Sequence, residues 1–378
     1  MTTFVDTSAL LSSQQAEDQD PVVVVVRSAQ AMLREGLGET GSEKFEKSFA
    51  ENYASQNFAA IFDLMLGNAN VIFKKVAAAD DVDRVSKTAE GYFEVCLSLL
   101  SKLETVEDVV SRIDSFIATV TGEQTVGLLR LKLLTTLFQT LSPKAELRLV
   151  IVRGMARFAA SDDKLAALAF ALVKDCDQWI VDNDWELSDS DKADLFGLVA
   201  KIATGAEKLR FLRLQVQAAP SPALIEALAV ETLRETSVVR MDSFIPHMSG
   251  STPAVDCVKT LASGDFDKME KFVAGNAAFF TSSKISSEAL LDKARVVALA
   301  KLAQTALATK QTTIALADVA AKLKTKDATA VVLRAVQTGL MVGSVDEVAG
   351  CVRIGAVAAA DWSSVASDLT RVLKHIGA

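Results

Sequence analysis

The chain has 378 residues, of which half are hydrophobic and 23% are charged, and its net charge is −8. This length is enough for a sizeable core and two or three domains, and the composition is that of a globular protein. Six prolines and 18 glycines, beside abundant alanine and leucine, favour helix over strand. Two histidines and two tyrosines leave few of the side chains that active sites usually use.

We expect a cytoplasmic protein that makes no contact with a membrane. The first basic residue is Arg27, so no charged region of a signal peptide is expected. The apolar run from Val22 to Val26 is far shorter than the ~20 residues that a membrane span needs. Gaps of about 80 residues or more between cysteines fit no zinc motif. They predict free thiols in a reducing cytosol at Cys96, Cys176, Cys257 and Cys351.

Charge is unevenly distributed along the chain. Residues 284–378 contain 12 Lys/Arg and 8 Asp/Glu, a net of +4, whereas residues 1–283 contain 28 Lys/Arg and 40 Asp/Glu, a net of −12. A basic C-terminal part on an acidic body predicts electrostatic steering towards a partner, but it does not identify that partner.

The chain is expected to begin with a disordered tail that leads into a helix. Residues 1–20 hold four acidic residues, no basic residue and few large apolar residues. Asp20 and Pro21 then resemble an N-cap followed by proline at the first helical position. The valines that follow favour strand by propensity, but residues 27–35 favour helix. We therefore predict that residues 21–35 are helical.

From about residue 42 to residue 280 the sequence repeats the pattern of amphipathic helices. Three segments place apolar residues on one buried stripe: Leu134, Leu137, Phe138 and Leu141; Leu165, Leu168, Leu172, Cys176 and Trp179; and Leu195, Leu198, Val199 and Ile202. Ser142-Pro143 and Ser221-Pro222 predict helix starts. Many helices with short connections and no strict period predict an irregular α-solenoid of helical repeats over residues 21–283.

The pattern changes in residues 284–360. Three helices are expected, over Glu288–Ala308, Ile314–Leu323 and Asp327–Thr338, and two short β-prone runs follow, Leu340–Val345 and Cys351–Val357. In the second run Val352 and Ile354 alternate with Arg353 and Gly355, as a half-buried strand requires. Three helices followed by a hairpin is the order of a winged helix, so a winged-helix module is predicted here.

The last segment, residues 361–378, is expected to form a C-terminal helix with one apolar stripe. Its apolar residues are spaced 3, 4, 3 and 4 apart over two heptads: Trp362, Val365, Leu369, Val372 and Ile376. Two heptads are too short to hold a helix by themselves. The stripe therefore packs either on its own domain or in a bundle with helices of partner chains, and the sequence leaves both open.

Several motifs resemble functional sites but lack residues that those sites require. Gly36–Gly41 matches G-x-G-x-x-G, but about ten residues separate it from the valine run and it lacks the lysine of a phosphate loop, so a flexible interhelical loop is expected. The acidic stretch Asp182–Asp194 lacks the glycine of a calcium loop and is expected to be a solvated loop. Neither His247 nor His375 has ligands or partners at catalytic spacing. No catalytic, cofactor-binding or metal-binding residue is predicted, and an enzyme is not expected.

A winged helix raises the possibility of nucleic-acid binding. The expected recognition helix offers only Thr329, Arg334 and Gln337 for contacts with bases, and valines and a leucine take most of its other positions. Three lysines before it suit nonspecific contacts with phosphates: Lys322, Lys324 and Lys326. This composition favours a wing that docks on protein, while direct contact with RNA stays open.

Helical repeats that run into a winged helix and a final helix resemble the PCI module of the proteasome lid, the signalosome and a translation initiation factor. Leu261–Phe266 with Phe272 resembles the small helical turn that often precedes the wing of this module. Leu129–Phe138 and the pair Trp179 and Trp185, the latter in the segment W-E-L-S, resemble the M-subunit family of eukaryotic translation initiation factor three. The resemblance covers residues 125–378, does not extend to residues 1–100, and leaves the sister PCI families as alternatives.

This resemblance implies a non-catalytic scaffold subunit of the initiation factor. In that family the winged helix joins other PCI subunits and the C-terminal helix enters a shared bundle. The assembled factor binds the small ribosomal subunit and supports recruitment of messenger RNA. The expected partner-binding residues are those of the wing hairpin and the terminal stripe: Val352, Ile354, Trp362, Val365, Leu369, Val372 and Ile376.

Overall fold

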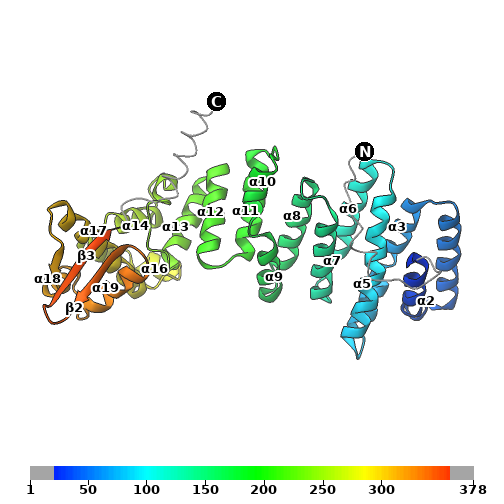
Figure 1. Cartoon of the computed structure of the whole chain (residues 1–378), viewed down its shortest axis with the longest axis horizontal. Coiled ribbons are helices and arrows are strands. Elements are labelled where there is room, and N and C mark those ends of the chain that lie inside the picture. The colour runs from blue at the N-terminus through cyan, green and yellow to red at the C-terminus, as the bar shows by residue number, and fades with distance from the viewer. Residues whose placement is uncertain (1–20, 358–378) are drawn as a thin grey trace. The chain divides into compact units, whose positions relative to one another are not determined.

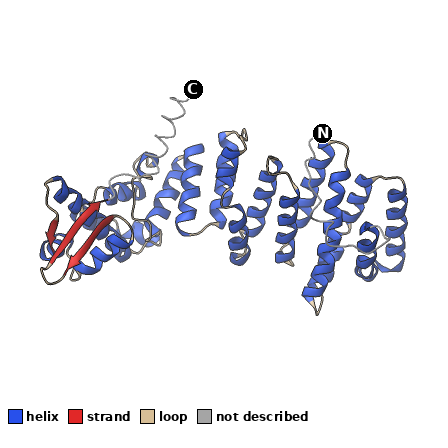
Figure 2. Ribbon diagram, viewed as in Figure 1, coloured by secondary structure: helices blue, strands red, loops and turns tan. Residues whose placement is uncertain are grey.

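The structure is a computed structural model that describes residues 21–357 (Figures 1 and 2). Two predictions therefore lie outside the described residues: the disordered tail at 1–20 and the C-terminal helix at 361–378. The chain divides into two compact units, Met1–Ser188 with Lys201–Ala203, and Asp189–Ala200 with Thr204–Ala378. The domain boundary predicted at residue 284 stays a prediction. The hydrophobic core of the second unit includes residues on both sides of it, from Leu209 to Ile354.

The first unit is built from helices. They are α2 (Pro21–Ala54), α3 (Phe58–Gly67), α4 (Ala69–Ala77), α5 (Val82–Ser98), the 3₁₀ helix η1 (Leu99–Lys102), α6 (Val106–Thr121), α7 (Gly127–Thr140), α8 (Leu147–Ala159), α9 (Asp163–Val173) and α10 (Cys176–Asp182). Helix α5 packs on α7 and α7 on α9, whereas α6 packs on α8 (Figure 1). Successive helices thus alternate between two layers, which is the arrangement of an α-solenoid.

The second unit contains more helices and the strands of the described chain. They are α11 (Asp189–Ile202), α12 (Gly205–Ala218), α13 (Pro222–Arg234), the 3₁₀ helix η2 (Ile245–His247), α14 (Pro253–Ala262), α15 (Phe266–Gly275), α16 (Ala277–Ser282), α17 (Ser287–Ala308), β1 (Thr313–Ala315), α18 (Leu316–Leu323), α19 (Ala328–Gln337), β2 (Met341–Asp346) and β3 (Cys351–Val357). Helices α12 to α15 pack on one another in chain order, and α17 packs on α14, α15 and α19.

The last part of this unit is a winged helix. Its three antiparallel strands lie in the order β1-β3-β2, with Ile314 opposite Val352 and Val345 opposite the same residue on the other side (Figure 2). Helix α17, β1, α18, α19 and the hairpin β2–β3 follow one another as in a winged helix. The fold class predicted from the sequence, a mostly helical stack followed by a winged-helix module, is confirmed.

Local signals set many of these boundaries. Ser221 accepts a hydrogen bond from the backbone N–H of Leu224, with Pro222 at the first helical position of α13, as predicted. Asp327 caps α19 in the same way, by accepting from the N–H of Ala330. The helix start predicted at Ser142-Pro143 is wrong, because these residues form a turn and α8 begins at Leu147.

The loop predicted over Gly36–Gly41 is wrong in extent. Helix α2 runs through this segment and departs from helical geometry only at Gly38, whose φ is 74° and ψ is 174°. A left-handed φ of this kind suits glycine, because it has no Cβ to clash. The glycine-rich motif is therefore a kink between two helical stretches, with no strand before it.

Candidate protein-docking surfaces

The wing hairpin holds the first two predicted partner-binding residues, Val352 and Ile354. Both side chains are buried in the core of the second unit, and both lie on β3, the central strand. Both edges of β3 are paired within the sheet, with β1 on one side and β2 on the other. Their contact with a neighbouring subunit stays a prediction, and strand pairing with another chain would use an outer edge of the sheet.

Strand β2 offers such an edge. It pairs with β3 alone among residues 21–357, so its other edge has no strand partner within the described chain. Val342 on this strand is 65% exposed, and Leu333 on the neighbouring α19 is 50% exposed. Val348 in the turn between β2 and β3 is fully exposed. Apolar side chains beside an open strand edge are typical of a surface that binds protein.

The turn of the wing is held in a defined shape by Asp346. Its carboxylate accepts hydrogen bonds from the backbone N–H of Ala349, at 2.9 Å, and from Arg353 Nη2, at 2.6 Å. The bond from Ala349, and after it the Arg353 guanidinium, hold the pKa of this carboxyl below its usual range. Gly350 closes the turn with a φ of 60°. The exposed Val348 is thus presented on an ordered turn.

One of the lysines predicted to suit phosphates, Lys324, is already paired with carboxylates of its own chain. Lys324 lies 2.7 Å from a carboxylate oxygen of Asp267 and 2.6 Å from one of Glu270 on α15. The hydrogen bonds that the Lys324 ammonium donates to these two carboxylates raise its pKa. On α19, Arg334 donates to the carbonyl of Thr236 at 3.5 Å. Both cations hold the wing onto its own unit, which weakens the case for contacts with nucleic acid.

The segments that carry the family resemblance have structural roles in the first unit. Trp179 lies against Phe138 on α7, with 5.4 Å between ring centroids, and Trp185 Nε1 donates to the carbonyl of Lys144 at 2.9 Å. Arg130 on α7 is fully buried and stacks on Phe73, with 3.8 Å from Cζ to the ring centroid. These residues hold neighbouring helices together.

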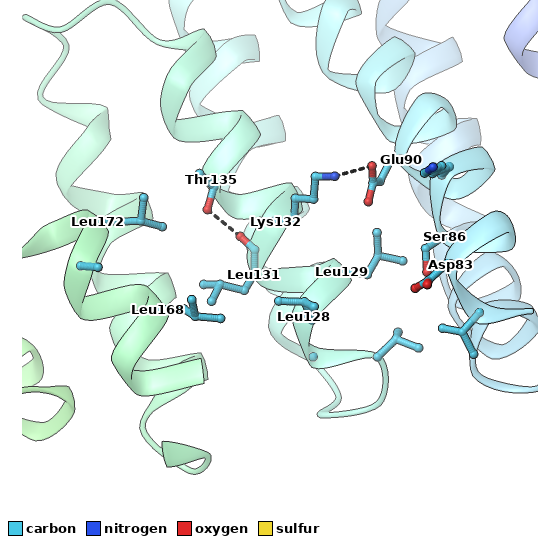
Figure 3. A pocket seen from close by; sticks show the side chains of 15 residues that line it. Asp83, Ser86, Glu90, Leu128, Leu129, Leu131, Lys132, Thr135, Leu168 and Leu172 are labelled. Atoms are coloured by element: carbon cyan, nitrogen blue, oxygen red, sulfur yellow. Dashed lines mark hydrogen bonds and ion pairs between the residues drawn. The ribbon is translucent and has the colours of Figure 1, made fainter. Parts of the chain in front are cut away.

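A groove on the first unit forms a concave, mostly apolar surface (Figure 3). It has a volume of about 760 Å³ and lies over α7, between α5 and α9. Val82, Leu128, Leu168 and Leu172 line it with exposed apolar side chains. On the α5 side the lining turns polar, with Asp83, Ser86, Lys87 and Glu90. Lys132 Nζ of α7 reaches Glu90 Oε2 at 2.5 Å across this side.

The structure corrects part of the apolar stripe that was predicted from Leu165 onward. Leu165 on α9 and Cys176 at the start of α10 are buried, as their spacing predicted. Leu168 and Leu172 were expected in the same stripe, but they are 48% and 38% exposed because they face the groove. Amphipathic spacing finds the apolar face of a helix and does not tell whether another element of the chain covers it.

The remaining sequence motifs form no reactive site in the described residues. Burial raises the pKa of the Cys257 thiol to about 12 and also raises that of Cys96, so both are inert at neutral pH. No cluster of three or more metal-ligating side chains occurs within residues 21–357. Asp182 ends α10 and Asp189 begins α11, so the predicted acidic loop is confined to residues 183–188. His247 lies in η2, and its Nε2 is 3.3 Å from Gln217 Nε2.

No helix in the described part of the chain is long and apolar enough to cross a bilayer. The terminal stripe, Trp362, Val365, Leu369, Val372 and Ile376, lies outside the described residues, as does His375. The role of this stripe in binding a partner stays a prediction.

Comparison with known proteins gives a distant relative. No protein-family model matches the chain. Subunit M of eukaryotic translation initiation factor 3 from Dictyostelium discoideum is 25% identical over 237 residues. The match covers 57% of this chain and 58% of the relative, so it spans little more than half of either protein. The resemblance inferred from the sequence is confirmed at this level: the chain is distantly similar to the M-subunit family of eukaryotic translation initiation factor 3.

Proposed function

We propose that the chain is a non-catalytic PCI subunit of a cytoplasmic translation initiation factor three complex. In this role it holds neighbouring subunits, so that the complex binds the small ribosomal subunit and supports recruitment of messenger RNA. The observation that carries the proposal is the distant similarity to an initiation factor subunit in a chain that ends its described part in a winged helix.

The wing and the terminal stripe are the proposed contact surfaces. The outer edge of β2, with Val342 and the nearby Leu333, suits pairing and packing with the wing of another subunit. The stripe from Trp362 to Ile376 suits a bundle with helices of other subunits.

A winged helix that binds nucleic acid is the second candidate. Lys322 and Lys326 are exposed beside the occupied Lys324, and they are the observation in its favour. Such binding would weaken steeply as salt rises, because it depends on release of counterions from the phosphates. Titration of RNA and DNA with the full chain at several salt concentrations tests it. Absent or salt-insensitive binding removes this candidate.

The main experiment tags the protein in its own cells and sediments the extract on a sucrose gradient, with mass spectrometry of the chains that co-purify. We expect co-migration with the small ribosomal subunit and with initiation-factor chains. Co-migration with proteasome or signalosome chains would keep the scaffold role and move it to a sister complex. A free monomer at the top of the gradient would contradict the scaffold role itself.

A further inference from the structure

Helix α7 is rich in leucine, and most of its leucines are buried. Leucines occupy nearly all of its faces, and Leu129, Leu133, Leu134 and Leu137 are buried within the first unit. Nevertheless, Leu128 is 65% exposed, because no described element covers the face of α7 that looks into the groove.

We propose that this groove binds an amphipathic helix of a partner chain. The helix would lie over α7 with its apolar face on Leu128, Leu168 and Leu172, while a charged flank faces α5. Leu168 and Leu172 are four residues apart on α9 and point into the groove from one wall (Figure 3). Two apolar side chains one turn apart on the wall can receive apolar side chains that a docked helix presents one turn apart.

The groove is poorly equipped to orient a small ligand. Its neutral polar side chains are few, and the hydroxyl of Thr135 already donates to the carbonyl of Leu131 at 2.9 Å (Figure 3). Small-molecule sites combine apolar walls with convergent polar groups, which this groove lacks. Its long apolar wall on α9 and its floor on α7 instead fit a continuous stripe of side chains.

Charges on α5 specify the flank of the docked helix. Asp83 and Lys87 are exposed on this wall, four residues apart and therefore about 6 Å from each other. Glu90 and Lys132 already neutralise one another. A complementary helix thus carries a basic residue opposite Asp83 and an acidic residue opposite Lys87, also four apart. An acid placed N-terminal to the base is the favoured order within a helix, so the partner runs antiparallel to α5.

This inference concerns a surface separate from the wing, and it holds whichever complex the chain enters. The test replaces Leu168 by photo-reactive benzoylphenylalanine in the full chain, in its own cells, and maps the cross-linked peptides of the purified complex by mass spectrometry. We expect cross-links to one amphipathic helix of another chain, with an acid and a base four residues apart. The yield should exceed that of the same probe at Val181, an exposed valine outside the groove, by about tenfold.

A second variant tests whether the cross-link depends on the apolar wall of the groove. Leu172→Asp places a charge on an exposed position of the wall, so the fold is expected to persist, as circular dichroism would verify. It should reduce the cross-link at residue 168 about tenfold, because a hot-spot contact is lost. Cross-links to residues 361–378, to a second copy of the chain, or to no protein would overturn the inference. Co-sedimentation with initiation-factor chains in the same preparation reports separately on the proposed function.

Discussion

At the scale of single residues, two fully buried cations have the same task in different units. Arg130 donates to the carbonyls of Thr119 and Val120 in the last turn of α6. Lys293 donates to the carbonyls of Thr232 and Glu235 at the end of α13, at 2.7 and 2.8 Å. The last carbonyls of a helix have no partner within it and carry the negative end of its dipole. A buried basic side chain therefore caps the C-terminal end of each of these two helices by donating hydrogen bonds to its last carbonyls.

Lys293 makes the stability of the second unit depend on pH. Burial lowers the pKa of this ammonium from 10.5 to about 7. Because the folded pKa lies below the unfolded value, the unfolded chain binds more protons between about pH 7 and 10.5. The free energy of unfolding should therefore rise with pH in this window, by at most about 1.4 kcal/mol per unit. Urea unfolding of the full chain, at several pH values from about 6.5 to about 10, measures this rise.

Lys293→Met keeps an unbranched apolar stem in the same space and cannot titrate. Its free energy of unfolding should stay flat over the pH window in which that of the natural chain rises. Curves that remain parallel for the two proteins would show that Lys293 is not the group responsible.

Arg130→Leu should destabilise the first unit strongly. The change leaves the carbonyls of Thr119, Val120 and Thr125 without their buried donor, at a cost on the order of 3 kcal/mol in the free energy of unfolding. Denaturant unfolding measures the loss. Arg84→Leu, which removes an exposed ion pair with Asp81, is the control and should cost less than about 1 kcal/mol. Equal losses in the two variants would contradict this account.

At the scale of elements, the sequence predicts helices well where a cap and a periodic stripe coincide. Helix α17 begins one residue before its predicted start, behind the cap Ser286, and α19 begins one residue after its predicted start, behind Asp327. The strand β1 was not predicted, because three residues are too few to show an alternation. The groove was also not foreseen. Leu168 and Leu172 have the spacing of core residues, and only the tertiary structure shows that they face a groove that no element of residues 21–357 fills.

The hairpin of the wing depends on Gly343. A Cβ at this position would lie 2.5 Å from the carbonyl oxygen of Arg353 on β3, where the register between the strands shifts. Gly343→Ala should therefore push β2 away from β3 and lower the free energy of unfolding by about 1–3 kcal/mol. Gly355→Ala in the same hairpin meets its nearest atom only at 3.4 Å and should cost clearly less. Thermal unfolding of both variants compares them, and equal melting temperatures would refute the steric argument.

At the scale of the whole molecule, the passage from helical repeats to a winged helix was predictable, and the domain boundary expected at residue 284 stays a prediction. The change from helical spacing to alternation near residue 340 is visible in the sequence. By contrast, apolar side chains on both sides of residue 284 enter one core, among them Leu261, Phe280 and Leu299. Contacts between residues far apart in the chain decide such a division, and local patterns do not encode them.

The double change Leu369→Asp and Val372→Asp tests the terminal stripe in the whole complex. Two charges on the stripe should release the chain from its partners, because a buried carboxylate without a counter-charge is very unfavourable. Affinity purification with quantitative mass spectrometry measures the loss. Ser363→Asp and Ser364→Asp, beside the stripe, serve as the control and should leave assembly unchanged. Stoichiometric co-purification of the stripe variant would exclude the bundle role.

The edge of β2 that has no strand partner among residues 21–357 also bears on how much of this protein a cell keeps. A copy of the chain that has no partner exposes this strand edge, Val342 and the leucines of the groove, and exposed apolar surface of this kind favours aggregation. Chaperones and proteases act on such surfaces. If partners cover these surfaces, we expect copies made in excess of those partners to be removed, so that the abundance of the chain follows the supply of the partners. The amount of this protein in the cell would then be controlled after its synthesis, by how much of it assembles with partners.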